Sequence, residues 1–330
     1  MCIRDRPYTA QSKELAIAAA NLAILTGNAG REGSGLYLCG EKSNSQGAID
    51  LGILPEKGAL GAKAMLEAAK SSNLSALYVV GEDLLTSYPD RSQLEAALKA
   101  VPFVVVQDIF LSPTAQQADV VLPATSFAEK DGTFTNAERR IQRVRPGVSS
   151  PGEAKTDFEI FETLSTRFGR NVSYTSAAAV FADIAANVPE YAGLQLEAIG
   201  AQGVVWGGDI LAPKKKRVVA VAADEVANSE FLLVTGSSLY HSGTMSTRAK
   251  GPLSVVSEPY IEFGQEDAKK LNVVDGDMIT VKAEGGQIKL KAKIDRRLPQ
   301  GVVFAPYHFA SAEINRLYKG EAVVPVQLSK

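Results

Sequence analysis

Short apolar runs alternate with helical stretches between residues 60 and 123, and this alternation restricts the possible fold more than any other feature of the chain. The apolar runs are followed by a glycine, an aspartate or a proline, as strands often are. Strands separated by helices are typical of a parallel sheet, so we expect an α/β domain here. The expected order is helix 62–71, strand 76–80, helix 92–100 with Ser92 as its N-cap, strand 103–107 and strand 120–122.

The pattern changes after residue 229. Four short β runs follow, FLLVTG, MITVKA, IKLKAKI and VVFAP, with one helix at residues 265–271 between them. The turn-forming strings VDGD, EGG and LPQG separate the later runs. A spacing of roughly ten residues between short strands predicts an all-β barrel as a second domain.

These two patterns divide the chain. We expect a non-native leader at residues 1–6, an α/β domain at 7–192, a glycine-rich linker at 193–229 and a barrel at 230–330. The α/β domain opens directly in a helix at residues 12–26, which indicates an N-terminally truncated fragment. Further helices are expected at residues 157–168 and 177–187.

Composition excludes several function classes. The 330 residues carry a net charge of −2, so no nucleic-acid partner is expected, and the basic run 214–217 is best explained as a solvated loop. No apolar run approaches the ~20 residues that span a bilayer, so we expect a cytoplasmic protein without direct membrane insertion. The two cysteines, Cys2 and Cys39, and the two histidines cannot build an iron–sulfur or zinc site by themselves.

Two successive strands of the expected sheet end in carboxylates. Gly81, Glu82 and Asp83 follow the first strand, and Gln107 and Asp108 end the second. Ligands of open α/β sheets bind beyond the carboxyl ends of the strands, where an aspartate accepts hydrogen bonds from a ribose or a guanine amino edge. A loop carboxylate or a helix cap is the alternative for each residue taken singly.

Two other segments are candidates for ligand binding, but their sequence patterns are less specific. The glycines of GNAGREGSG (27–35) follow a helix instead of a strand, which excludes an ordinary NAD fingerprint and leaves a helix C-cap or a loop that approaches a ligand. The stretch 129–147 is expected to form a hairpin, and its basic side chains either face solvent or contact an anionic cofactor or a partner subunit. These side chains are Lys130, Arg139, Arg140, Arg143 and Arg145.

In the second half, residues 236–248 (GSSLYHSGTMSTR) are dense in small hydroxyl residues directly after a strand. Such a loop can bring backbone amides and hydroxyls to a phosphate, with His241 as a donor and Arg248 as a phosphate partner. A structural role for the lone histidine is the alternative. Because the chain shows no Ser-His-Asp order and no paired acid–base carboxylates, we expect a binding loop and no catalytic residue.

Several strings together resemble the C-terminal half of the molybdopterin oxidoreductases. The resemblance covers almost everything after residue 11, and the ungapped stretch 104–144 is its most specific part. The strings that carry it are LTGNAGREGSG, NSQGAIDLG, ALYVVGEDLL, VVVQDIFLSPTAQQADVVLPATSFAEKDGTFTNAERRIQRV, LYHSGTMSTR and VDGDMITV…LPQGVVFAPYHF.

The resemblance implies an α/β molybdopterin oxidoreductase domain with a parallel sheet, followed by a C-terminal double-psi β-barrel that closes over a molybdopterin guanine dinucleotide. Matching positions near the guanosine are Gly81, Glu82, Asp83, Gln107, Asp108 and Asp119. Matching positions around the pterin and its phosphates are Gly236, Leu239, His241, Ser242, Thr244, Met245 and His308.

The molybdenum ligand and the cysteines that hold iron–sulfur clusters in this family have no match in the chain, so the resemblance places the clusters in a missing N-terminal part. The member that the chain resembles most is the large iron–sulfur subunit of NADH:quinone oxidoreductase (complex I), and the formate dehydrogenase α subunit comes next. The single histidine of LYHSGTM favours the complex I subunit. A non-catalytic scaffold or assembly module of the same fold is the alternative from another class. The resemblance implies partner subunits of a respiratory or formate-oxidising complex, which would hold the chain at the inner face of the plasma membrane. We expect the chain alone to be inactive.

Overall fold

The fold was analysed in a computed structural model that describes residues 2–3, 12–31, 33–38, 42–53, 59–170, 174–206, 217–220, 229–320 and 323–330. Most of the expected leader, Cys39 and Lys214 to Lys216 of the basic run lie outside these residues. Cys2–Ile3 (β1) pair in parallel with Tyr37–Leu38 (β2), so two residues of that leader take part in a strand.

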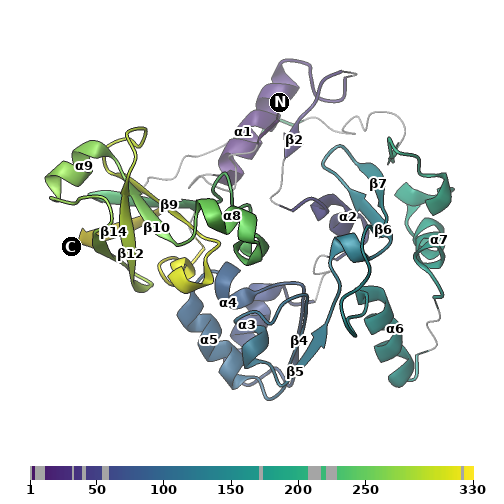
Figure 1. The fold of residues 1–330 in the computed structure, drawn as a ribbon. Coiled ribbons are helices and arrows are strands. Elements are labelled where there is room, and N and C mark those ends of the chain that lie inside the picture. Colours follow the sequence, from purple (N-terminus) through teal and green to yellow (C-terminus); the bar gives the residue numbers. More distant parts are fainter. Residues whose placement is uncertain are drawn as a thin grey trace.

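The first part of the chain carries helices with a few short strands between them (Figure 1). Its elements are α1 (Ser12–Leu25), α2 (Ser45–Asp50), α3 (Ala62–Lys70), β3 (Leu77–Val80), α4 (Leu84–Ser87), α5 (Arg91–Ala100), β4 (Val104–Asp108), β5 (Val120–Pro123), β6 (Gly132–Thr135), β7 (Arg140–Val144), α6 (Asp157–Arg167), α7 (Ala177–Asn187) and β8 (Val204–Val205). The glycine segment 27–35 follows α1, and the amide of Gly27 donates to the carbonyl of Ile24, as in a helix C-cap.

The expected parallel sheet is confirmed. Strands β3, β4 and β5 form a three-stranded parallel sheet with β4 in the centre. One face is covered by α3 and α5, and its core includes the fully buried Val106 and Ala97. Because all three strands run in the same direction, their carboxyl ends meet at one edge of the sheet.

The cap of α5 differs from the expectation. The helix begins at Arg91 instead of Ser92, and its N-cap is Asp90, whose carboxylate accepts a hydrogen bond from the amide of Gln93 at 3.2 Å. Asp90 has a φ of 56°, a left-handed conformation that Asp tolerates better than most residues. The sequence Asp-Arg-Ser offers two capping residues, and the turn after Pro89 selects the first.

A second small sheet lies beside the first (Figure 1). It contains the antiparallel hairpin β6–β7 expected within 129–147, with β8 added to β7. The hairpin turns at Asn136–Arg139, where Asn136 accepts from two amides and Arg139 has a φ of 63°. Gly132 starts β6. Helices α6 and α7 stand on the far side of this sheet from α2.

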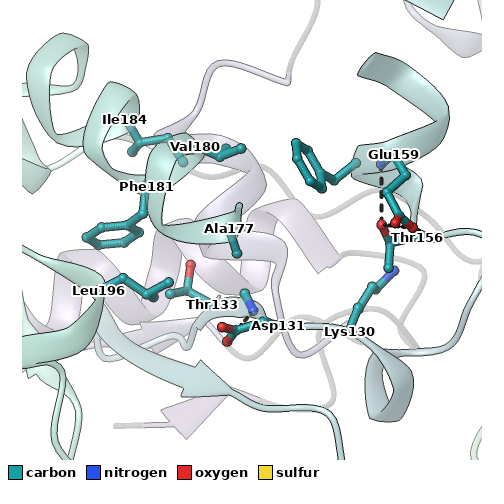
Figure 2. A pocket seen from close by; sticks show the side chains of 12 residues that line it. Lys130, Asp131, Thr133, Thr156, Glu159, Ala177, Val180, Phe181, Ile184 and Leu196 are labelled. Atoms are coloured by element: carbon teal, nitrogen blue, oxygen red, sulfur yellow. Dashed lines mark hydrogen bonds between the residues drawn. The ribbon is translucent and has the colours of Figure 1, made fainter. Parts of the chain in front are cut away.

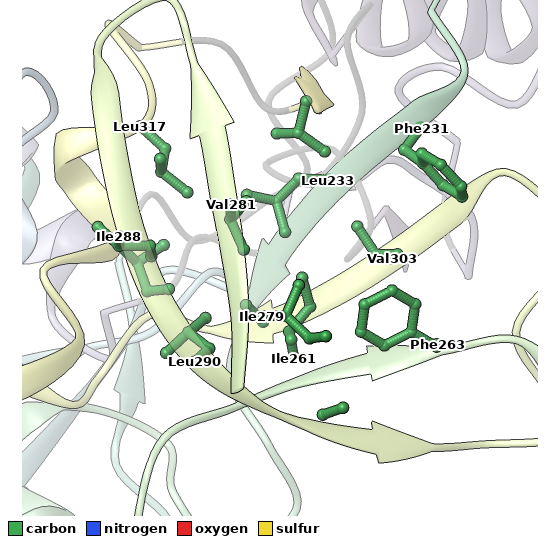
Figure 3. Close-up of a cluster of buried hydrophobic side chains, with 14 of the residues drawn as sticks. Phe231, Leu233, Ile261, Phe263, Ile279, Val281, Ile288, Leu290, Val303 and Leu317 are labelled. Atoms are coloured by element: carbon green, nitrogen blue, oxygen red, sulfur yellow. The ribbon is translucent and has the colours of Figure 1, made fainter. Parts of the chain in front are cut away.

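The last part of the chain folds into a closed barrel with the strand order β10-β12-β11-β14-β9-β13. Its elements are β9 (Phe231–Gly236), α8 (Lys250–Val255), β10 (Tyr260–Phe263), α9 (Gln265–Lys270), β11 (Met278–Ala283), β12 (Gly286–Ile294), β13 (Val302–Pro306) and β14 (Val323–Ser329). Fully buried side chains such as Leu233, Ile261 and Phe263 fill its interior (Figure 3). The expected barrel is therefore confirmed, with β10 and β14 added to the four strands that the pattern identified.

Candidate functional site

A pocket of about 400 Å³ lies between the carboxyl edge of the parallel sheet and the loops of the barrel. One wall comes from the ends of β3, β4 and β5, and the other from the turns after β9 and β13. Eight of the residues selected from the sequence line this pocket: Gly81, Glu82, Asp83, Gln107, Asp108, Thr244, Met245 and His308. Its volume is within the ~300–1,000 Å³ of typical ligand pockets.

The structure does not bring the other five selected residues to this pocket. Asp119 precedes β5 and lies at the opposite edge of the sheet, where its carboxylate accepts from the amide of Val104 at 2.7 Å. Gly236 ends β9, and its carbonyl accepts from the amide of Tyr307 at 3.2 Å. Leu239 is 88% exposed, Ser242 is exposed, and His241 is buried inside the barrel loop.

The carboxylates of the first wall divide into buried and available groups. Asp83 is buried and accepts from the amide and hydroxyl of Thr114 and from the hydroxyl of Thr86, so its oxygens are occupied within the protein. Asp108 is half-buried and accepts from the amide of Ile109 at 2.7 Å and the hydroxyl of Ser112 at 3.1 Å. Since a carboxylate offers about four acceptor sites, Asp108 retains capacity toward the pocket and is held in a fixed orientation.

Gln107 belongs to a chain of hydrogen bonds at the floor of the pocket. The amide oxygen of Gln107 accepts from the hydroxyl of Tyr78, and its amide nitrogen donates to Asp157 Oδ1 at 2.6 Å. Asp157 also forms an ion pair with Lys130, which lines the pocket. Burial, with a smaller contribution from the charge of Asp157, raises the pKa of Tyr78, so this hydroxyl remains a donor. Gln107 therefore orients Asp157 and, through it, the ammonium of Lys130.

Basic side chains reach the pocket from both walls. Lys130 comes from the α/β domain, and Arg248 comes from the barrel turn at Thr244–Arg248. The guanidinium of Arg248 lies over the ring of Phe110, the exposed residue that follows Asp108 and Ile109. The pocket thus combines carboxylates at the sheet edge with a cation on each wall.

The two histidines form a buried pair, with ring centres 4.8 Å apart and both residues 0% exposed. His241 contacts Ser246 Oγ at 3.0 Å and the carbonyl of Val256 at 2.8 Å, so both of its ring nitrogens are engaged by the barrel itself. Within the described residues, neither ring nitrogen of His308 has a hydrogen-bond partner. Burial lowers the pKa of His308 to about 4, with a further contribution from His241, so this ring is neutral at pH 7.

Sequence reasoning missed several residues of the pocket, among them Phe110, Thr125 and Asp157. Thr125 is 1% exposed, and its hydroxyl has no partner among the residues that the structure describes. Asp157 could have been considered from the sequence, because it stands at the start of an expected helix, shortly after the basic hairpin. Its contact with Lys130 could not, because the two residues are 27 positions apart. Lys130, one of the basic side chains expected either to face solvent or to contact an anionic cofactor or a partner subunit, lines the pocket.

A second pocket of about 320 Å³ lies between β6, α6 and α7 (Figure 2). Its wall along α7 and the adjacent loop is apolar and includes Val180, Phe181, Ile184 and Leu196. Three charged residues line it: Asp131 pairs with Arg143, Glu159 closes a capping box with Thr156, and Lys130, which pairs with Asp157, also lines the first pocket. This pocket therefore offers shape and apolar surface, and its rim charges are already paired.

Metal binding and membrane spanning are both without support in the part of the chain that the structure describes. No group of three or more His, Cys, Asp or Glu side chains within these ranges is arranged to hold a metal ion. Over the same ranges, none of the helices is long and apolar enough to span a membrane.

The residues around the pocket leave polar groups and open space for a ligand. Two buried groups at the pocket have no hydrogen-bond partner among the described residues. They are the Thr125 hydroxyl and the ring nitrogens of His308, and they lie on opposite walls. Gly81 has a φ of 65°, and a Cβ built on it would meet no protein atom within 4 Å, so a ligand can approach this backbone closely.

The sequence and the fold are similar to those of known proteins. The molybdopterin oxidoreductase family profile matches residues 8–167, and the molybdopterin dinucleotide-binding domain profile matches residues 231–328. The chain is 36% identical over 350 aligned residues to the F420-dependent formate dehydrogenase subunit alpha of Methanocaldococcus jannaschii, covering 91% of this chain and 52% of that protein. It is 34% identical over 344 residues to an NADH-quinone oxidoreductase subunit of Rhizobium meliloti, covering 93% of this chain and 39% of that protein.

Among solved structures, acetylene hydratase from Pelobacter acetylenicus shares the fold, with a TM-score of 0.70 and 16% sequence identity over 83% of this chain and 47% of that chain. The chain spans about half the length, or less, of the relatives named above. The two profiles match the two domains in the order in which the chain contains them, and relatives above 30% identity extend across both. The chain therefore belongs to the molybdopterin oxidoreductase family and ends in a molybdopterin dinucleotide-binding domain.

Proposed function

We propose that the pocket between the sheet edge and the barrel binds the guanosine diphosphate end of a molybdopterin guanine dinucleotide. The observation that carries this proposal is the position of Asp108, a fixed and partly available carboxylate at the carboxyl end of the central strand β4. When bound, the pterin would supply the metal site at which electrons are transferred. The residues of this chain supply binding and orientation.

Asp108 is suited to the base. Guanine presents a ring N–H and an amino group side by side, and a carboxylate accepts from both. Adenine presents a ring nitrogen acceptor where guanine has the N–H, so the acceptor oxygens of Asp108 repel that edge. The pocket should consequently prefer guanine over adenine nucleotides.

Lys130 and Arg248 are suited to the phosphates. Lys130 is fixed by Asp157, and Arg248 can leave the ring of Phe110 to form a two-point contact with a phosphate. Their positions on opposite walls mean that a bound diphosphate would connect the α/β domain to the barrel.

Two parent activities fit such a site. The single histidine of LYHSGTM favours the large iron–sulfur subunit of an NADH:quinone oxidoreductase, as inferred from the sequence. The 36% identity across 91% of the chain favours a formate dehydrogenase α subunit instead. In both cases the chain would act inside a complex, with partner subunits and iron–sulfur clusters supplied by other parts. Metal and pterin analysis of the complete gene product distinguishes a cofactor-binding subunit from a cofactor-free scaffold. Dye reduction with formate and with NADH then distinguishes the two activities from each other.

The binding proposal is tested on the chain itself by isothermal titration with GDP and with ADP. Wild-type chain should bind GDP weakly and ADP at least tenfold more weakly, because ADP lacks the paired donors. Asp108→Asn should remove the preference for GDP and leave ADP binding nearly unchanged. Glu266→Gln is the matched control, since Glu266 is an exposed carboxylate on α9 that pairs with Lys269 and does not line the pocket. Equal binding of both nucleotides by wild type contradicts the proposal.

A further inference from the structure

The barrel and the α/β domain meet in a dense polar contact, which we call the interdomain joint. Its two sides are residues 85–95, from α4 into α5, and residues 313–318, between β13 and β14 of the barrel. The amide of Asp90 donates to the carbonyl of Tyr318 at 2.8 Å across this contact. The joint is separate from the pocket, because none of these residues lines it.

Asn315 lies at the centre of the joint and is 1% exposed. Its amide nitrogen donates to the carbonyl of Leu85 at 3.0 Å and to the carbonyl of Tyr88 at 2.6 Å. These two acceptors fix the orientation of the amide, since the reversed orientation would place its oxygen against two carbonyl oxygens. Both amide protons of Asn315 thus bind the α/β side, one at Leu85 within α4 and the other at Tyr88, which follows α4.

Four charged side chains surround Asn315 and cross the same boundary. Arg316 of the barrel pairs with Glu95 of α5 at 3.1 Å, and Arg91 of α5 pairs with Glu313 of the barrel at 3.2 Å. Each arginine also pairs with the acid of its own domain, Arg91 with Glu95 at 2.8 Å and Arg316 with Glu313 at 2.7 Å. Alternating charges in a partly buried ring restrict the relative motion of the two domains more than an isolated surface pair does.

The two sides of the joint continue directly into the two walls of the pocket. On the α/β side, Glu82 and Asp83 line the pocket and α4 begins at the next residue. On the barrel side, His308 and Ala310 line the pocket, and only Ser311 and Ala312 separate Ala310 from the joint. A shift of the joint therefore displaces both walls through very short rigid connections.

We infer that the interdomain joint sets the separation of the two pocket walls, with Asn315, Arg316 and Glu95 as positioning residues for the ligand. This inference rests on the proposed nucleotide site, because it assigns the joint a role in holding that site ready for binding. The joint contacts no ligand itself. Its effect on affinity comes from the geometry that it imposes on residues such as Asp108 and Arg248 on opposite walls.

A double-mutant cycle on GDP binding tests the inference. Glu95→Ala and Arg316→Ala should each weaken GDP binding about tenfold, and the double variant should be no weaker than either single variant, because each change opens the same joint. Asn315→Ala should act in the same direction. Lys293→Ala is the matched control, because Lys293 on β12 forms an ion pair with Glu262 on β10, within the barrel domain and away from the joint.

A second readout reports the position of the domains without any ligand. Spin labels at Lys99→Cys on α5 and Lys289→Cys on β12, both exposed positions, are placed in a chain with Cys2→Ser and Cys39→Ser. The label-to-label distance should be narrow in wild type and in Lys293→Ala, and broad in Asn315→Ala and Arg316→Ala. A merely local loss of stability lowers the melting temperature without broadening this distance.

Unchanged label distances in the joint variants overturn the inference, and so does additive loss of GDP affinity in the double variant. A wild-type chain that binds no GDP contradicts the proposed function alone. The label distances then decide on the joint: broadening confined to the joint variants supports it, and equal widths in all variants reject it.

Discussion

The guanidinium carbon of Arg248 lies 5.3 Å from the centre of the Phe110 ring, and this contact connects the barrel to the α/β domain across the pocket. Phe110 follows the central strand β4, whereas Arg248 ends the turn that begins at Thr244. A cation over an aromatic ring at a partly exposed site contributes roughly 0.5–1 kcal/mol, which a charged ligand easily exceeds. Arg248 is therefore held near the pocket and remains able to exchange the ring for a phosphate.

Arg248→Ala should weaken binding of GDP about tenfold and binding of guanosine hardly at all, because only GDP carries the phosphates that Arg248 would contact. Isothermal titration with both ligands measures the difference. Increasing salt should reduce the advantage of GDP in wild type and have little effect in the variant. Equal losses for GDP and guanosine would show that Arg248 acts on the base or on the fold.

Barrel stability should depend on the protonation of His308. Its folded pKa of about 4 lies below the ordinary value of 6.5, so the unfolded chain binds more protons between these two pH values. Stability is then complete above about pH 6.5 and decreases as the pH falls toward 4, by about 3 kcal/mol in total. Urea unfolding at pH 7.5 and pH 5 should show about two thirds of this loss in wild type and a much smaller loss in His308→Gln. The same loss in both proteins would assign the pH dependence to other groups.

A separate loss is expected at lower pH from Glu95 in the interdomain joint. Burial raises the pKa of this carboxyl, but the hydrogen bonds and charges of Arg91 and Arg316 outweigh it and leave the pKa below its usual range. A depressed carboxylate pKa stabilises the folded state above the unfolded value, and the stabilisation is lost as the pH falls through the folded value. Glu95→Gln should remove this low-pH component and leave the His308 component in place. Urea unfolding below about pH 4.5 measures it, and an unchanged acid limb in the variant would reject the assignment.

The core of the barrel should be sensitive to truncation at Phe263, which is 0% exposed and packs among buried residues such as Ile261 and Val303 (Figure 3). Phe263→Ala should reduce the free energy of unfolding by about 3–5 kcal/mol, the range for a buried phenylalanine that leaves a cavity. Val274→Ala is the control, because Val274 is 60% exposed and its truncation should change stability by less than about 0.5 kcal/mol. Chemical unfolding of both variants decides whether this cluster is the core.

Trp206, the only tryptophan of the chain, reports on the contact between α2 and the hairpin sheet. Its indole N–H donates to Asp50 Oδ2 at 2.8 Å, and Tyr191, whose pKa is raised to about 12 by burial and then by Asp50, donates to the same oxygen at 3.1 Å. Asp50→Ala should release α2 and shift tryptophan emission to longer wavelength. Asp183→Ala is the control, since Asp183 on α7 accepts from the exposed hydroxyl of Tyr174 and does not contact the indole. Identical spectra for the two variants would contradict this assignment.

Local sequence patterns predicted the elements well and the contacts between them poorly. Helix α7 and strands β9, β11 and β13 have the expected bounds, because each is a periodic or β-branched segment ended by turn residues. Strands β10 and β14 were missed. β14 contains Pro325, which ordinarily argues against a strand but pairs here with Leu232 of β9.

For the site, the strand-end rule brought Glu82 and Asp108 to one pocket correctly, because strand direction alone determines which edge they share. The same reasoning could not show that Asp83 accepts two hydrogen bonds from Thr114, since that partner lies 31 residues away. Likewise, His241 was expected at the ligand but is held by the carbonyl of Val256, a tertiary contact that no local pattern contains. Whether the selected residues bind a cofactor stays a prediction.

The most direct test of a nucleotide site between the domains is amide hydrogen exchange of the 330-residue chain with and without GDP. A nucleotide site there predicts slower exchange on both walls together, in residues 81–83 and 107–110 of the α/β domain and in 244–248 of the barrel. The second pocket, represented by residues 177–184 of α7, should be unaffected. Protection confined to one domain, or centred on α7, would contradict the account.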